Sequence, residues 1–134
     1  MSRVNNLPSV QSPARVLVVE DDPDLSASLG MFITELGYQA NLATNGREAL
    51  EVLARHTPAL ILIDLVMPVM SGGELLRALR DDPMLARIPR VVMTGINDLM
   101  IGIKENVEVL YKPLDHIMLT KVLRRYCHAT ARAD

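Results

Sequence analysis

The chain has 134 residues, of which 49% are hydrophobic, 14 are Lys or Arg and 16 are Asp or Glu, so its formal net charge is −2. This length fits one domain. The near balance of charge gives no basic field, so we expect no nucleic-acid partner. The apolar runs are too short to span a bilayer and no apolar targeting segment is visible, which predicts a cytoplasmic protein without a membrane partner. The single cysteine, Cys127, allows no intrachain disulfide and is interpreted as an inert helix residue.

The first third of the chain alternates between strand and helix patterns. Residues 1–14 are polar with two prolines, and we expect a disordered N-terminal arm there. Residues 16–19 form an apolar, largely β-branched run, which is typical of a strand buried on both faces of a parallel sheet. Asp22-Pro23 then predicts a helix start, and Gly37 predicts the end of that helix.

The same alternation continues to the end of the predicted domain. Further strands are expected over residues 38–43, 59–63, 90–93 and 107–111, and helices after caps at Asn45, Ser71 and Asp115. A short, poorly marked helix is expected over residues 97–106. The last helix is expected to carry the apolar residues Met118, Leu119, Val122, Leu123 and Tyr126, with Met118 filling a gap in the core. Residues 128–134 read as a short C-terminal tail. Five strand–helix units in succession predict an α/β, flavodoxin-like, doubly wound five-stranded parallel sheet, (βα)5, over residues 15–127.

Charged and hydroxyl side chains stand where the predicted strands end. Glu20 and Asp21 follow the first strand, Asp64 the third, Thr94 the fourth and Lys112 the fifth. Since the carboxyl ends of parallel strands meet at one edge of a sheet, we expect these five side chains to converge. Clustered carboxylates repel one another, and Mg²⁺ prefers oxygen ligands, so the cluster predicts a magnesium site.

The same residues are suited to phosphoryl transfer. A carboxylate can act as a covalent nucleophile, and the transfer requires charge neutralisation and positioning more than acid–base chemistry. Asp21 and Asp64 are expected to bind the metal directly, with Glu20 acting through water. Lys112 and the metal would neutralise the transferring oxygens, while the Thr94 hydroxyl would donate to one of them.

Five fragments of the sequence resemble the signature of response-regulator receiver domains, of the stand-alone kind related to chemotaxis regulators. They are Val16–Asp22, Asp64-Leu65-Val66-Met67-Pro68, Gly72, Met93-Thr94-Gly95 and Lys112-Pro113, and the resemblance extends from Arg15 to about Tyr126. Each fragment alone is weak evidence, but together, in order and at successive strand ends, they are specific.

The resemblance implies a phosphoacceptor role for Asp64, supplied by a phosphohistidine on a sensor histidine kinase or phosphotransfer protein. It implies Mg²⁺ as the cofactor, bound by Asp21, Asp64 and the backbone carbonyl of Val66, with Glu20 beside it. Lys112 would pair with Asp64 and later with the phosphoryl group, and Thr94 would be the switch hydroxyl. The peptide before Pro113 is usually cis in this family. A receiver catalyses only its own phosphorylation and dephosphorylation, so we do not expect this chain to be an enzyme in the usual sense.

Two departures from the family pattern affect the expected output. An aromatic residue usually stands three residues before the lysine, where this chain has Val109; whether the nearby Tyr111 substitutes for it is left open. The segment between Thr94 and Lys112 is also shorter than usual by roughly one helical turn. These departures predict a small rearrangement near the site. The signal is expected to pass through contacts with an unknown downstream protein or through phosphoryl relay.

Three other functions remain to be weighed. A pseudo-receiver would be an interaction module that no longer accepts phosphate. The complete acidic set with Lys112 argues against it, whereas Val109 and the short fourth helix are compatible with it. An aspartyl-phosphate phosphatase of the haloacid-dehalogenase type would need a second Asp two residues after the nucleophile, where this chain has Val66. An FMN carrier would bind phosphate after the first strand, where residues 20–22 are acidic and would repel it.

Overall fold

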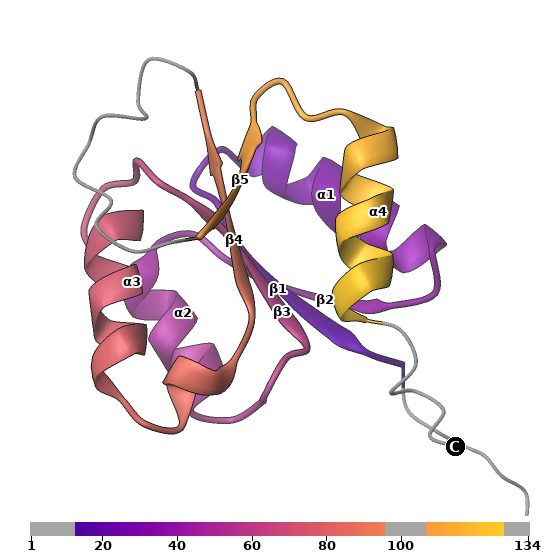
Figure 1. Ribbon diagram of the computed structural model, residues 1–134. Coiled ribbons are helices and arrows are strands. Elements are labelled where there is room, and N and C mark those ends of the chain that lie inside the picture. The colour runs from indigo at the N-terminus through magenta and orange to yellow at the C-terminus, as the bar shows by residue number, and fades with distance from the viewer. Residues whose placement is uncertain (1–12, 96–106, 128–134) are drawn as a thin grey trace, which may run out of the picture.

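The computed structural model describes residues 13–95 and 107–127, and within them five parallel strands form one sheet (Figure 1). The strands are β1 (Arg15–Val19), β2 (Gln39–Ala43), β3 (Leu60–Asp64), β4 (Arg90–Thr94) and β5 (Glu108–Tyr111). Their spatial order is β2-β1-β3-β4-β5, so the direction of winding reverses between β1 and β3. This order confirms the predicted flavodoxin-like fold, in which the reversal is the usual place for a binding site.

Helices cover both faces of the sheet. Helices α1 (Pro23–Glu35) and α4 (His116–Tyr126) lie on one face, and α2 (Gly46–Leu53) and α3 (Gly72–Asp81) lie on the other (Figure 1). A short 3₁₀ turn, η2 (Leu85–Arg87), precedes β4. The helix predicted over residues 97–106 lies outside the described residues. None of the helices in the described ranges has the length and hydropathy that a membrane crossing requires.

The predicted helix caps are confirmed. The side chains of Asp22, Asn45 and Asp115 each accept a hydrogen bond from the first turn of the helix that follows. At α3, Ser71 and Glu74 form a reciprocal capping box. Each cap satisfies backbone N–H groups that have no partner within the helix, which fixes where the helix begins.

Two hydrophobic cores sandwich the sheet, and alternate residues of each strand supply them. Leu17 and Val19 of β1 face α2 and α3, whereas Val16 and Val18 face α1 and α4. All five residues of β3 are buried, as its uninterrupted apolar run predicts. The prediction for Met118 is wrong, because its side chain is 47% exposed while Leu119, Val122 and Leu123 form the buried stripe. Met118 precedes that stripe by one residue, which turns it about 100° away from the core.

The start of α3 is packed directly against the end of β3. The N–H group of Gly72 donates to the carbonyl oxygen of Leu65 at 3.0 Å. A Cβ atom at Gly72 would overlap the backbone carbonyl oxygen of Asp64 and lie 2.7 Å from the Cα of Leu65. Because both neighbours are backbone atoms, no side-chain movement can make room, and glycine is required to hold the strand end in place.

We therefore expect Gly72→Ala to lower the free energy of unfolding by about 2 kcal/mol, through overpacking against backbone. Gly73→Ala is the matched control, because a Cβ there meets only the Ser71 hydroxyl oxygen at 3.9 Å. That control should be neutral or stabilising by up to about 1 kcal/mol, as alanine favours a helix over glycine. Urea denaturation of both variants measures the difference, and equal stabilities would refute the packing argument.

Candidate functional site

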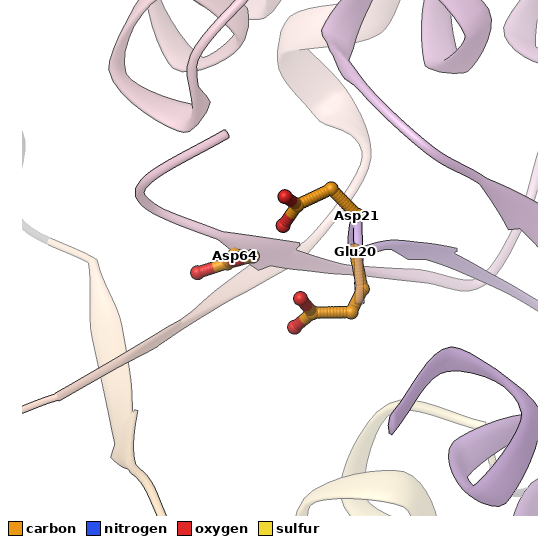
Figure 2. Close-up of side chains that lie close together, drawn as sticks. All are labelled: Glu20, Asp21 and Asp64. Carbon is orange, nitrogen blue, oxygen red and sulfur yellow. The ribbon is translucent and has the colours of Figure 1, made fainter. Parts of the chain in front are cut away.

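Three carboxylates gather at the edge of the sheet where the winding reverses. Glu20 and Asp21 directly follow β1, and Asp64 is the last residue of β3, the adjacent strand. Figure 2 shows the three side chains together at these two strand ends, and one carboxylate oxygen from each lies within 4.8 Å of the others. Glu20 is 1% exposed and Asp64 5% exposed, whereas Asp21 is open to solvent. The predicted convergence of these three residues is confirmed.

Lys112 brings a positive charge to the same point. It follows β5, two strands away from β3, and its Nζ lies 3.1 Å from Glu20 Oε1 and 3.4 Å from Asp64 Oδ1. Burial of the ammonium opposes its charge, but the hydrogen bond and ion pair with Glu20 and Asp64 outweigh it and raise the pKa of Lys112. The lysine therefore stays protonated beside the two buried carboxylates. The Lys112–Pro113 peptide is cis, as the resemblance implies.

Burial makes the negative charge of Glu20 unfavourable. Desolvation raises the pKa of Glu20 from 4.5 to about 7, and the nearby charge of Asp64 adds to the rise. The backbone N–H of Asp22, which donates to Glu20 Oε2 at 3.1 Å, and the bond from Lys112 act in the opposite direction. A single lysine thus leaves the three-carboxylate cluster with excess negative charge.

The donor set fits a hard divalent cation. The cluster consists of carboxylates alone, and hard cations such as Mg²⁺ take oxygen ligands and only one or two carboxylates directly. Asp21 is exposed and belongs to the same cluster as the buried Asp64, so the cluster is open to solvent on the side of Asp21. Glu20 has both oxygens engaged, one by Lys112 and one by the Asp22 N–H, which suits a supporting position better than direct ligation.

Thr94 lies at the same edge but is bonded elsewhere. It ends β4, one residue beyond Met93, which is the register partner of Asp64. Its side chain is buried, and Oγ1 donates to the carbonyl oxygen of Gly95 at 3.1 Å. Because a hydroxyl has one hydrogen to donate, Thr94 must give up this bond before it can donate to a group on Asp64.

Tyr111 is positioned beside Thr94. The two residues are register partners in the β4–β5 pair, and Val109 pairs with Val92. Leu110 packs into the core beneath α1 and α4, so by strand alternation Val109 and Tyr111 face the α2 and α3 side together with Thr94. The aromatic ring is exposed there, two residues further along β5 than the family pattern places it.

One feature of the site edge was not predicted from the sequence. Val69 has a φ of 68°, and the N–H of Met70 donates to the Pro68 carbonyl oxygen at 2.8 Å. These two observations define a γ-turn with a positive central φ, which is rare and strained. A β-branched residue is a clear outlier in this conformation. The residue pattern carries no signal for it, because glycine or asparagine would be expected at such a position.

Comparisons with known proteins agree with this geometry. The chain matches the response regulator receiver domain family over residues 16–124. It is 31% identical over 113 residues to Protein Rrf1 of Nitratidesulfovibrio vulgaris, which covers 84% of this chain and 82% of that protein. It is also 36% identical over 110 residues to the response regulator PleD of Caulobacter vibrioides, which covers 79% of this chain but 24% of PleD.

Two solved structures illustrate the likeness. The receiver domain of the sensor histidine kinase PA1611 from Pseudomonas aeruginosa PAO1, with a magnesium ion coordinated in its active-site cleft, superposes with a TM-score of 0.76 at 26% identity, covering 88% of this chain and 100% of that one. The chemotaxis protein CheY4 of Vibrio cholerae superposes with a TM-score of 0.74 at 27% identity, covering 86% and 99%. The acidic strand-end site, the strand order and these matches together show that the chain belongs to the response regulator receiver domain family, a family of signalling domains.

Proposed function

We propose that this chain is a phosphoacceptor response regulator of a two-component phosphorelay, with Asp64 receiving a phosphoryl group from a histidine kinase or phosphotransfer protein. The observation that carries this proposal is the contact of Lys112 with both Glu20 and Asp64 at the edge where the sheet reverses its winding. That arrangement supplies a nucleophile, a fixed positive charge and a cation site within one small volume.

Mg²⁺ would be held by Asp21, Asp64 and the backbone carbonyl of Val66, with Glu20 acting through water. The magnesium ion coordinated in the PA1611 receiver supports this assignment for a relative of the same fold. When bound, Mg²⁺ neutralises negative charge on the transferring phosphoryl oxygens.

The side chains of this chain have separate tasks in the transfer. A carboxylate oxygen of Asp64 forms a bond to phosphorus as the bond from phosphorus to the donor imidazole nitrogen breaks, and the imidazole leaves with the electron pair. The N–H of Val66, 3.4 Å from Asp64 Oδ1, restricts the orientation of the carboxylate. Lys112, already beside Asp64, can then pair with the new phosphoryl oxygens, and Thr94 can donate its hydroxyl to one of them.

The alternatives explain fewer of these features. A pseudo-receiver has no need for a half-buried lysine held between two buried carboxylates, which are costly to desolvate. A phosphatase would need an acid–base group two residues after Asp64, and that position is Val66. We further propose that the signal leaves through contacts with an unknown downstream protein or by phosphoryl relay.

Incubation with acetyl phosphate and Mg²⁺ should add one phosphoryl mass to the protein, and Asp64→Asn should abolish the gain because an amide is not a nucleophile here. Intact-mass spectrometry measures both. Asp81→Asn is the matched control, since Asp81 is an exposed carboxylate at the far end of α3. Labelling of the Asp64 variant at the rate of the control would refute the assignment.

Mg²⁺ should raise the melting temperature, because an ion that binds only the folded state stabilises it. At about ten times the dissociation constant the gain is about 1.4 kcal/mol. Asp21→Ala should remove most of this gain, whereas Asp24→Ala, an exposed acid in the first turn of α1, should keep it. Thermal melts with and without about 10 mM Mg²⁺ test this, and an equal gain in both variants would count against the proposed ligands.

In metal-free protein, Glu20 should make stability depend on pH. Its pKa is raised to about 7 in the folded state, so the folded state binds more protons than the unfolded state above pH 4.5. The contribution of Glu20 to stability is therefore largest below that pH and falls as the pH rises through 7, by a few kcal/mol at most at about 1.4 kcal/mol per pKa unit. Glu20→Gln should flatten this fall and Glu51→Gln, on the exposed face of α2, should not. Urea denaturation from pH 5 to 8 measures these changes. A stability that rises with pH, or the same fall in the Glu20 variant as in the wild type, would contradict the prediction.

A further inference from the structure

Helices α1 and α4 lie side by side on one face of the sheet, and a shallow groove, which we call the α1–α4 groove, runs between them (Figure 1). It has a volume of about 300 Å³ and is lined by Phe32 of α1 and by His116, Ile117, Thr120 and Lys121 of α4. Ring stacking joins the two helices here, because the ring centroids of Phe32 and His116 lie 4.8 Å apart with an interplanar angle of 17°. The groove is therefore a preformed feature of the fold.

Large apolar side chains stand open to solvent around this groove. Ile117 is 67% exposed at its edge, and Met31, which precedes Phe32 in α1, is 64% exposed. Both are among the four most exposed large hydrophobic side chains of the described residues. Apolar side chains that gather around a groove, rather than stand singly, are typical of a surface that another protein covers.

Charged residues are separated by sign across the groove. The exposed acids of α1 are Asp24 and Glu35, and this helix has no Lys or Arg. Helix α4 has no acidic residue and carries Lys121, Arg124 and Arg125. Among the described residues, the two acids of α1 form no ion pair, and neither do Lys121 and Arg124. Glu35 also lies in the last turn of α1, where a negative charge opposes the helix dipole, so helix stability does not account for it.

This separation of charge indicates which partner fits the groove. A surface of one sign would indicate a partner of the opposite sign, whereas this surface carries both halves of a complementary pair. A two-fold axis along the groove sets α1 of each copy against α4 of the other, so that each acidic helix meets a basic one. The exposed apolar side chains then lie at the centre of the contact, with the charges at its margins.

We propose that the α1–α4 groove is the contact surface between two copies of this chain in a two-fold symmetric dimer. Met31 and Ile117 of each copy are buried against the apolar surface of the other, and Glu35 of one copy lies opposite Lys121 of the second copy. Burial of the apolar side chains supplies the affinity, while the charges fix the register and exclude other arrangements. This inference does not depend on phosphoryl transfer to Asp64.

Sedimentation velocity on the full chain, from about 1 to 100 µM, measures the dissociation constant of the dimer. The wild type should shift from monomer to dimer as the concentration rises. Ile117→Asp places a charge at the centre of the contact and should raise the dissociation constant by at least about tenfold. Because Ile117 is exposed, this variant should melt at the wild-type temperature when both are monomeric. Met84→Asp is the matched control, at a 70% exposed residue between α3 and η2, and should leave the constant unchanged.

A charge exchange tests whether the partner is a second copy of the chain. Glu35→Lys and Lys121→Glu should each raise the dissociation constant by about fivefold or more, because the two-fold axis repeats each like-charge contact. An equal mixture of the two variants should recover the wild-type constant. In the mixed dimer one contact keeps the native pair and the other carries the same pair reversed, so both are attractive. Arg87→Glu, at an exposed residue of η2, is the charge control and should change nothing.

A wild-type chain that stays monomeric up to about 100 µM would overturn the dimer. A dimer that Ile117→Asp leaves intact, or two charge variants whose mixture recovers nothing, would place the contact elsewhere and overturn the proposal as well. If the chain is monomeric and Ile117→Asp instead slows phosphoryl transfer from a phosphotransfer domain, the groove serves a different protein. None of these results bears on whether acetyl phosphate labels Asp64, so the dimer and the proposed function fail separately.

Discussion

The site depends on one interaction, the contact of the Lys112 ammonium group with the carboxylates of Glu20 and Asp64. It joins the ends of β1, β3 and β5, and the lysine side chain must cross the end of β4 to reach them. Burying charge is unfavourable unless it is paired, and the half-buried Lys112 supplies the pairing charge for the buried carboxylates of Glu20 and Asp64. The strand order is thus tied to the chemistry: only a sheet that places β1 beside β3 brings these charges together.

The backbone around Asp64 is also held in place by close packing. Gly72 allows α3 to begin against the last peptide of β3, and the loop from Leu65 to Gly72 is closed by the hydrogen bond between its two ends. The backbone of Asp64 is therefore held by strand pairing on one side and by a closed loop on the other. The positive φ of Val69 lies in a loop that is packed at both sides, since Gly46 contacts Met70 and Gly72 contacts Asp64 and Leu65.

The sequence predicts those features of the structure for which one residue type meets one physical requirement. Apolar β-branched runs predict buried strands, Asp22 and Ser71 predict caps, and charges that end a buried strand predict a site. It failed where the outcome depends on a neighbour that the pattern does not specify. The exposure of Met118 depends on which residues α4 turns toward the sheet, and the Thr94 hydroxyl bonds to Gly95 because that carbonyl lies within reach. The positive φ of Val69 opposes the preference of a β-branched residue.

Thr94 is placed where it could pass a structural change from a phosphoryl group on Asp64 to the neighbouring strand β5. Its hydroxyl donates to a neutral carbonyl in this structure, and bonds to charged oxygens are roughly twice as strong, so exchange of the Gly95 carbonyl for a phosphoryl oxygen is favourable. The backbone carbonyl of Thr94 accepts from the Lys112 N–H at 2.9 Å, and Tyr111 is its register partner. The backbone of Thr94 is therefore joined directly to Lys112, the residue that follows β5. The exposed Tyr111 ring, rather than Val109, is the aromatic group closest in register to that change.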